Sequence, residues 1–239
     1  MKIAAFSDAH ANLPALQAAL QAIEREGVEA IYHTGDAIAI GPHPAECLDL
    51  LLHTPRLHPI MGNHDMWFAH GLPQPQPAWM SDGEVEHQHW THAQLDPTLK
   101  AVVARWPRVV RQEWEGVRVT LMHYPPADSA SGMVPTLRDP DATDLDQLFF
   151  SYPSDIVFYG HTHRAQDCQG QAHYVNLGSL GCAPTAVARF AILTCQGGHC
   201  KLEHHAVPYD DRPLLEAFET RQVPERAFIY RAFLGARFP

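Results

Sequence analysis

Five short blocks of polar residues that can bind metal ions lie along this chain. They read Asp8-Ala9-His10, Gly35-Asp36, Gly62-Asn63-His64-Asp65, a single His123, and Gly160-His161-Thr162-His163. Four of the five blocks follow a run of residues that is typical of a buried β-strand. Because α/β proteins build their sites at the carboxyl ends of parallel strands, we expect these side chains to converge at one sheet edge.

The residue types predict which metals would bind. Carboxylates combined with imidazoles suit manganese, iron, zinc or nickel, whereas calcium and magnesium prefer shells made of oxygen. Two divalent ions about 3.5 to 4 Å apart can polarise a phosphoryl group, activate water and stabilise a leaving oxygen. The residue types therefore favour divalent transition metal ions as cofactors, manganese first, and a pair of such ions would be able to act on a phosphoester.

The order and the residues of the blocks resemble the motifs of the calcineurin-like metallophosphoesterases, which are D-x-H, G-D, G-N-H-D/E, H and G-H-x-H. The resemblance extends from residue 3 to about residue 180 and includes Ser7 and the stretch from Asn176 to Ser179. A G-D-x-x-x-x-G-P segment, Gly35 to Pro42, is similar to the compact bacterial and archaeal phosphoesterases. The resemblance implies an α/β fold of two packed mixed β-sheets flanked by helices, an αββα sandwich.

The resemblance also implies a role for each polar residue. It assigns Asp8, His10 and His163 to one metal, Asn63, His123 and His161 to the other, and Asp36 to a bridging position. A bridging carboxylate is physically apt, because two close dications repel each other and a shared anion offsets part of that repulsion. An amide ligand is neutral, so Asn63 leaves its metal more Lewis acidic than a carboxylate would.

Three further residues are expected to act on the substrate. By resemblance, His64 contacts the phosphoryl group together with Asn63 and assists the leaving oxygen. Asp65 is expected to orient the His64 imidazole, as carboxylates do for other catalytic histidines, with a helix N-cap as its alternative role. Arg164 is the arginine that adjoins a ligand block, and we assign it to substrate binding.

The other histidines match no ligand position, and we interpret them as ordinary surface or core residues. The exception to consider is the group His87, His89 and His92, although residues at i, i+2 and i+5 share one helix face poorly. Tryptophans such as Trp67 and Trp79 either stack on a nucleobase or pack the chain around them.

Composition limits the classes of protein to which the chain can belong. Its 239 residues, 46% of them hydrophobic, are enough for a single domain spanning 1–239. A formal net charge of -10 argues against a stable nucleic-acid partner. No signal peptide or membrane span is expected.

The cysteines indicate the compartment. There are five, without a C-x-x-C pair, which favours a reduced, cytoplasmic protein with free thiols. Cys195 and Cys200 are the exception to consider, because they flank a hairpin turn.

Hydrophobic periodicity predicts the elements that position the blocks. Strands are expected at residues 3–6, 30–33 and 57–61, at 109–114 and 117–123 as a hairpin, and at 156–159, 174–177, 187–194 and 200–207. Helices are expected at 13–26, 44–52, 85–95 and 141–150. Residues 66–107, rich in Pro, Trp and His, are interpreted as an insertion that caps the site.

The function indicated is that of a dinuclear metal-dependent phosphoesterase in which metal-bound hydroxide attacks the phosphorus. A phosphodiesterase acting on small or nucleotide-type substrates is preferred, because no Arg follows Gly35-Asp36, whereas related protein phosphatases have D-R-G there. The alternatives are a protein serine/threonine or other phosphomonoester phosphatase, an exonuclease, and a metal-bound regulatory module without activity. The sequence does not determine the natural substrate, the metal pair or the oligomeric state.

Overall fold

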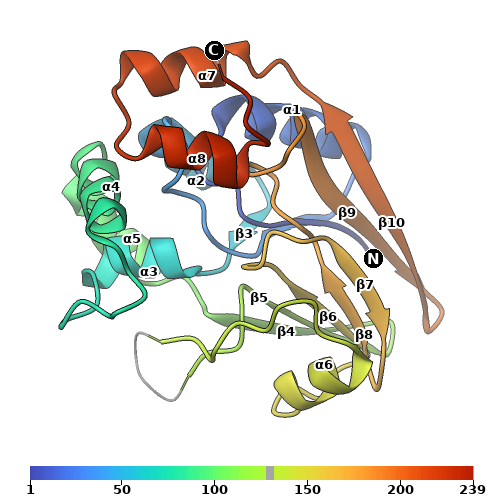
Figure 1. The fold of residues 1–239 in the computed structure, drawn as a ribbon. Coiled ribbons are helices and arrows are strands. Elements are labelled where there is room, and N and C mark those ends of the chain that lie inside the picture. The colour runs from blue at the N-terminus through green and yellow to red at the C-terminus, as the bar shows by residue number, and fades with distance from the viewer. Residues whose placement is uncertain (128–131, 239) are drawn as a thin grey trace.

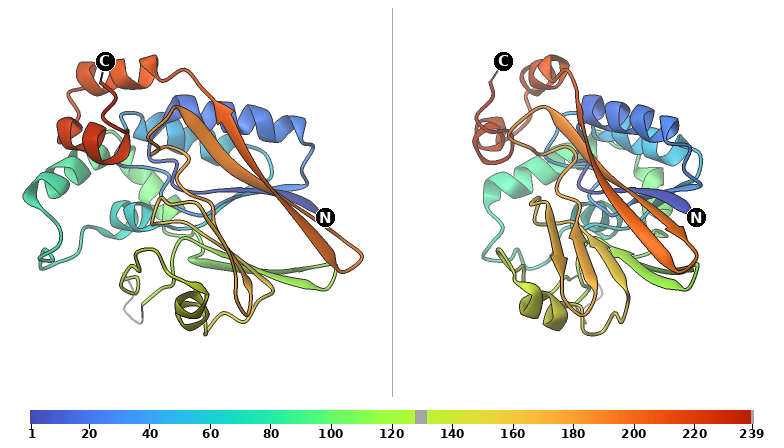
Figure 2. Two further views of the ribbon diagram at one scale, coloured as in Figure 1. Left: turned by 45° about the vertical axis from the view of Figure 1, so that its right-hand side comes forward. Right: turned by 90° about the vertical axis from the view of Figure 1, so that its right-hand side faces the viewer.

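A computed structural model of the protein describes residues 1–127 and 132–238. Within these ranges the strands form two five-stranded sheets that face each other (Figures 1 and 2). The first sheet has the order β10 (His199–Pro208), β9 (Val187–Gln196), β1 (Lys2–Phe6), β2 (Ala30–His33), β3 (Leu57–Pro59). The second has the order β4 (Val109–Trp114), β5 (Val117–Met122), β6 (Ile156–Tyr159), β8 (His173–Asn176), β7 (Gln166–Gln169). Both sheets mix parallel and antiparallel pairs, so the predicted fold class is confirmed.

Alternating side chains of the strands divide the core into layers, because successive residues of a strand point to opposite faces. In β1, Ile3 and Ala5 belong to the core between the sheets, whereas Phe6 packs on the outer helical side. In β6, Phe158 points inward and Tyr159 outward. The space between the sheets is therefore filled by apolar side chains, and the polar blocks lie beyond the strand ends.

Helices cover the outer face of each sheet. Helices α1 (Leu13–Arg25), α2 (Pro44–His53) and α3 (Asn63–His70) contribute to the core cluster on the first sheet, and α6 (Ala142–Leu148) covers the second. Helices α7 (Arg212–Thr220) and α8 (Arg226–Phe233) form a separate apolar cluster that includes Ile40 and Cys182 (Figure 1). No helix in the described ranges is long and apolar enough to cross a membrane.

The segment expected to be an insertion contains more helix than predicted. It holds most of α3, then α4 (Asp82–Ala93), a 3₁₀ turn η1 (Pro97–Leu99) and α5 (Lys100–Val103). Helix α4 starts earlier than the predicted residue 85, because the Ser81 side chain accepts a hydrogen bond from Glu84 N at 3.1 Å and caps the helix.

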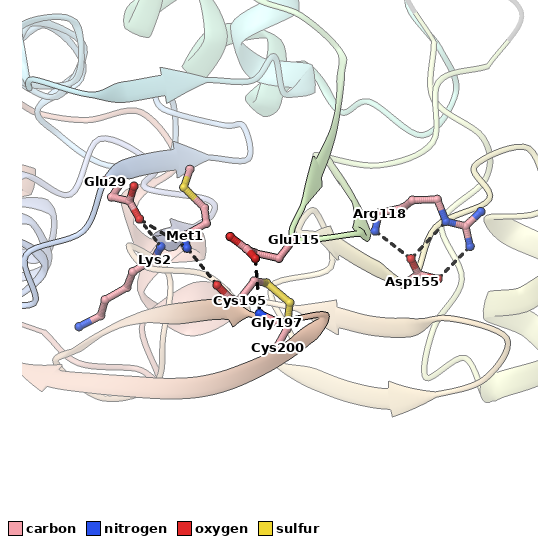
Figure 3. The surroundings of a disulfide bond; sticks show 9 residues. All are labelled: Met1, Lys2, Glu29, Glu115, Arg118, Asp155, Cys195, Gly197 and Cys200. Carbon is pink, nitrogen blue, oxygen red and sulfur yellow. Dashed lines mark hydrogen bonds and ion pairs between the residues drawn. A yellow bond between two sulfur atoms is a disulfide. The ribbon is translucent and has the colours of Figure 1, made fainter.

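The β9–β10 hairpin carries a disulfide between Cys195 and Cys200, the two cysteines that the sequence singled out as the exception to free thiols (Figure 3). The two cysteines are opposite each other in the antiparallel register, with Cα atoms 4.1 Å apart. A pair in this position closes the turn of its own hairpin. Because disulfides are rare in reducing compartments, the cysteines no longer favour such a compartment for this protein.

Candidate metal centre

The strand ends of both sheets bring the five polar blocks together. In the first sheet, Phe6 of β1 pairs with His33 of β2 in a parallel register, so the loops that follow leave the sheet side by side. They are joined by a hydrogen bond from Asp8 N to Gly35 O of 2.9 Å. In the second sheet, Gly160 N donates to His123 O at 2.9 Å. The seven predicted ligands thus gather in one place.

One cluster contains the first set of predicted ligands. His10 Nε2 and His163 Nε2 lie 2.8 Å apart. Asp8 Oδ1 lies 3.6 Å from the His10 nitrogen and 3.4 Å from the His163 nitrogen. One carboxylate oxygen and two ring nitrogens therefore face a common point.

A second cluster contains the other set. Asn63 Oδ1 lies 3.2 Å from His123 Nε2 and 3.0 Å from His161 Nδ1, and these two nitrogens are 3.3 Å apart. The carboxylate of Asp36 lies between the clusters, with Oδ2 3.1 Å from His123 Nε2 and 3.9 Å from His10 Nε2. This is the position that a bridging ligand requires.

Two of the rings are held so that their second nitrogen is left for a metal. His123 Nδ1 donates to Thr34 O at 3.0 Å, and His10 Nδ1 donates to Ile38 O at 3.3 Å. A neutral imidazole that donates from Nδ1 presents a lone pair on Nε2, which is how metal-binding histidines are usually oriented. The donor set and its orientation therefore fit two divalent transition metals.

The backbone at the ligands is strained. Five of the seven predicted ligands have positive φ angles, namely Asp8, His10, Asp36, His161 and His163. Non-glycine residues in this region cost of order 1–3 kcal/mol each and persist only where the surrounding structure holds them. The loops also approach closely, since a Cβ atom on Gly160 would lie 1.9 Å from Ser7 Oγ. Strain concentrated on these residues indicates a functional site.

Charges in the centre are strongly coupled. Burial alone would raise the pKa of Asp36, but the neighbouring imidazoles, His123 first, outweigh burial and hold that pKa well below its usual range. Burial lowers the pKa of His123, yet Asp36 and Asp8 overcome it and raise the pKa to about 9. Burial, followed by the charge of His123, lowers the pKa of His161 to about 4. Without metal, two carboxylates thus rely on a protonated imidazole for compensation.

His64 lines the site, but Asp65 does not orient its ring as predicted. The Asp65 carboxylate accepts hydrogen bonds from the backbone N–H groups of Asp36 (2.8 Å), Ala37 (3.0 Å) and Gly62 (3.0 Å). It therefore fixes the Asp36 loop and accepts from the N-cap of α3, which is Gly62, so Asp65 takes part in capping as the third helical residue and not as the N-cap itself. The His64 ring is instead bonded at Nδ1 to Gln88 Nε2 of α4, at 2.7 Å.

A pocket of about 760 Å³ opens over the centre. Its described lining comprises Asp36, Ile40, Asn63, His64, Met66, Trp67, Pro73, Trp79, Glu84, Gly132, Met133, Val134, Pro135, Thr136, His161, His163 and Phe233. Arg164, predicted to bind substrate, is not among these residues. Its side chain is exposed and forms an ion pair with Asp139.

Sequence reasoning missed several residues near the centre. Gln88 carried no motif, and Phe233 lies on a helix that was not predicted. Cys182 was interpreted as an ordinary thiol, but its sulfur and one ring nitrogen each of His10 and His163 lie within 4.8 Å of one another. In contrast, His87 is a structural residue that accepts a hydrogen bond from Ile40 N at 2.8 Å and donates to Pro224 O at 3.1 Å.

Comparison with known proteins assigns the family. Residues 1–198 match the family model described as the calcineurin-like phosphoesterase superfamily domain. The match covers most of the chain, so the protein belongs to the calcineurin-like phosphoesterase superfamily. The predicted family is thereby confirmed.

Individual relatives are distant in sequence but similar over their full length. An uncharacterised protein of Methanocaldococcus jannaschii is 23% identical, over 93% of this chain and 94% of its own. A hypothetical protein of Pyrococcus horikoshii has the same fold with a TM-score of 0.81, at 19% identity and 98% coverage of both chains. A metallophosphoesterase of Sphaerobacter thermophilus has a TM-score of 0.69, at 21% identity and 97% coverage of both.

Proposed function

We propose that this protein is a dinuclear metal-dependent phosphodiesterase that acts on small or nucleotide-type phosphodiesters. The observation that carries the proposal is the position of Asp36 Oδ2 between two clusters of ligand atoms, at the floor of an open pocket. When bound, two divalent metals would polarise the phosphoryl group and activate water, which is the chemistry this superfamily uses. Asp8, His10 and His163 would hold one metal, Asn63, His123 and His161 the other, and Asp36 both.

The remaining residues of the pocket orient the substrate. His64 is one of the lining residues, with Nε2 3.9 Å from Asp36 Oδ2, close to where the phosphoryl group would lie. It would donate a hydrogen bond to a phosphoryl or leaving oxygen. We also propose that the 66–107 insertion acts as a cap, because Trp67, Trp79 and Glu84 contribute one wall of the pocket.

A diester is favoured over a monoester by the charge of the pocket. Its described lining contains no Lys or Arg, but includes Glu84 besides the bridging Asp36. A monoester carries close to two negative charges at neutral pH, and sites for it gain from guanidinium groups that pair with the additional oxygens. Apolar side chains of Trp67, Trp79 and Phe233 offer contacts for a second ester group, which a monoester lacks.

The test compares kcat/KM for bis-aryl and mono-aryl phosphates with the same leaving group, in saturating Mn²⁺ and at one pH. A monoester would lack a cationic partner for its additional charged oxygen in this pocket. A hydrogen bond to a charged group is worth about 1.5–3 kcal/mol, so the diester should be preferred by roughly ten- to a hundredfold. 2′,3′-Cyclic nucleotides serve as the biological diester. A preference for the monoester would instead support the phosphatase alternative, and no hydrolysis of any ester would support the regulatory module.

A further inference from the structure

Helix α4 contributes a residue that contacts the His64 ring directly. Gln88 is 1% exposed, and its Nε2 donates to His64 Nδ1 at 2.7 Å. The residue comes from the insertion, outside every block of the metallophosphoesterase pattern. The contact therefore adds a component to the site that the ligand pattern does not include.

The helix that carries Gln88 is held from two sides. Its neighbour His87 accepts a hydrogen bond from Ile40 N and donates one to Pro224 O, which ties α4 to the Asp36 loop and to the segment before α8. Ile40 has a φ of +62°, a strained angle for a β-branched residue, so the contact with His87 stabilises an unfavourable backbone. Helix α4 cannot shift without disturbing the loop that carries Asp36.

The hydrogen bond determines where the neutral His64 ring carries its proton. An imidazole that accepts at Nδ1 must be protonated at Nε2. Nε2 is the nitrogen near Asp36 Oδ2 and the pocket, so the ring presents an N–H donor where a phosphoryl oxygen would lie. The other tautomer would present a lone pair to an anionic substrate and repel it.

The His64 ring is also held in its plane by neighbouring rings. It packs edge-on against Trp67, with centroids 4.8 Å apart, and against His10, with centroids 5.3 Å apart. These contacts fix the angle of the ring but do not distinguish its two nitrogens. The tautomer is therefore selected by the hydrogen-bond partner at Nδ1, which is Gln88.

We propose that Gln88 is a positioning residue that holds His64 as the Nε2–H tautomer, so that the ring donates to the phosphoester oxygen. The proposal deepens the proposed function, on which it rests for the role of His64. If Gln88 acts through His64, a substitution at Gln88 should have no effect on the rate once His64 has been removed. A residue that acts by simple packing would still have its effect.

The first measurement is the tautomer itself, independent of activity. Long-range ¹H–¹⁵N correlation spectra of metal-free protein with ¹⁵N-labelled histidine identify His64 by comparison with His64→Gln. We expect protonation at Nε2 in the native protein, a mixture in Gln88→Leu, and protonation at Nδ1 in Gln88→Glu, whose carboxylate can only accept. A native His64 protonated at Nδ1, or spectra that do not respond to Gln88→Leu, would overturn the proposal.

The second measurement is a double-mutant cycle in Mn²⁺-loaded enzyme. Gln88→Leu should lower kcat by roughly ten- to a hundredfold, part of the factor that general acid–base help supplies, with KM and metal content nearly unchanged. In a His64→Ala background it should lower kcat no further. Gln94→Leu, at the C-cap of the same helix, is the matched control and should leave kcat unchanged.

The two measurements separate failure of the inference from failure of the function. If Gln88→Leu lowers kcat equally with and without His64, Gln88 acts through packing and the proposal is wrong. If His64→Ala itself keeps the native kcat, the proposed role of His64 fails, whereas the spectra still decide whether Gln88 sets the tautomer.

Discussion

Asp36 is the residue on which both proposed metal positions depend. Its Oδ2 is shared by the two clusters, and its Oδ1 accepts a hydrogen bond from His64 N at 2.9 Å. A change to Asn would preserve the shape of the side chain and remove the charge that offsets repulsion between two dications. The substitution should therefore weaken the binding of both metals and not of one alone.

We therefore expect Asp36→Asn to lose activity and to weaken the binding of both metals. The loss of affinity should exceed the roughly 10–100-fold that outer hydrogen-bond partners of metal ligands contribute. Metal content by mass spectrometry and titration with Mn²⁺ would measure it, with Asp139→Asn, a surface change, as the control. A variant that retains two metals at native affinity would show that Asp36 does not bridge them.

His64 is expected to matter according to the leaving group. General acid–base help is worth about a hundred- to ten-thousandfold, and more of it is needed when the leaving oxygen is poorly stabilised. His64→Ala should therefore lose more rate on an alkyl or ribose ester than on an activated aryl ester. Equal losses on both would show that His64 binds the phosphoryl group without assisting departure.

Helices α3 and α4 contribute side chains both to the pocket lining and to the support of His64. Trp67 and Trp79 stack with ring centroids 6.1 Å apart, and Trp79 is 66% exposed. An exposed indole over a polar site can stack on an aromatic or nucleobase group, which is worth about 1–3 kcal/mol.

Trp79→Ala should accordingly raise KM for aryl and nucleotide diesters by roughly tenfold, within the range for one stacked ring. Metal content should stay unchanged, because the Trp79 ring stacks on Trp67, which is not a predicted ligand. Dimethyl phosphate, which has no ring to stack, is the control substrate. Loss of metal from a folded Trp79→Ala protein would mean that the cap supports the ligands instead of the substrate.

The sequence predicted the strands better than the surrounding helices, for a physical reason. Strands such as β1 and β6 are buried runs whose hydrophobicity is visible locally. They belong to different sheets, and the packing of the two sheets brings their ends together, where His161 N donates to Asp8 Oδ2 at 3.2 Å. Helices α7 and α8 bury one face against Ile40 and Cys182, which are distant in sequence. A short amphipathic stretch gives little local signal when its partner is not known.

The same limit explains why Asp65 was expected to bind the His64 ring and Gln88 was not. A carboxylate next to His64 in sequence was expected to bind its ring, but Asp65 lies at the start of α3 and its oxygens are used by backbone N–H groups. The ring partner, Gln88, is 24 residues away along the chain. Contacts between side chains of separate elements follow from packing, which short motifs do not encode.

The whole molecule should remain folded without metal. The core between the sheets consists of apolar side chains and contains none of the predicted ligands. Exhaustive chelation should abolish hydrolysis and leave the circular dichroism spectrum unchanged, with Mn²⁺ restoring the rate. Metal at 100 times its dissociation constant adds about 2.7 kcal/mol per site, so the melting temperature should fall by roughly 10–20 °C on removal of both. Unchanged turnover in protein shown to be metal-free would refute the metal mechanism.

Acid should destabilise the metal-free molecule partly through His33. This residue is fully buried, neither ring nitrogen has a hydrogen-bond partner among the described residues, and burial lowers its pKa to about 3. An unfolded histidine has a pKa near 6.5, so below that pH the unfolded state binds a proton that the folded state refuses. The folded state therefore loses about 1.4 kcal/mol per pH unit from this one group between pH 6.5 and about 3.

Replacement of His33 with Leu should remove that dependence and also the cost of two buried polar nitrogens without partners. We expect His33→Leu to stabilise the metal-free protein, and by about 1.4 kcal/mol more at pH 5.5 than at pH 7.5. Urea unfolding at the two pH values measures the difference, and because other titrating groups are common to both proteins, their contributions cancel. An equal effect of His33→Leu at both pH values would show that His33 does not remain neutral in the folded state.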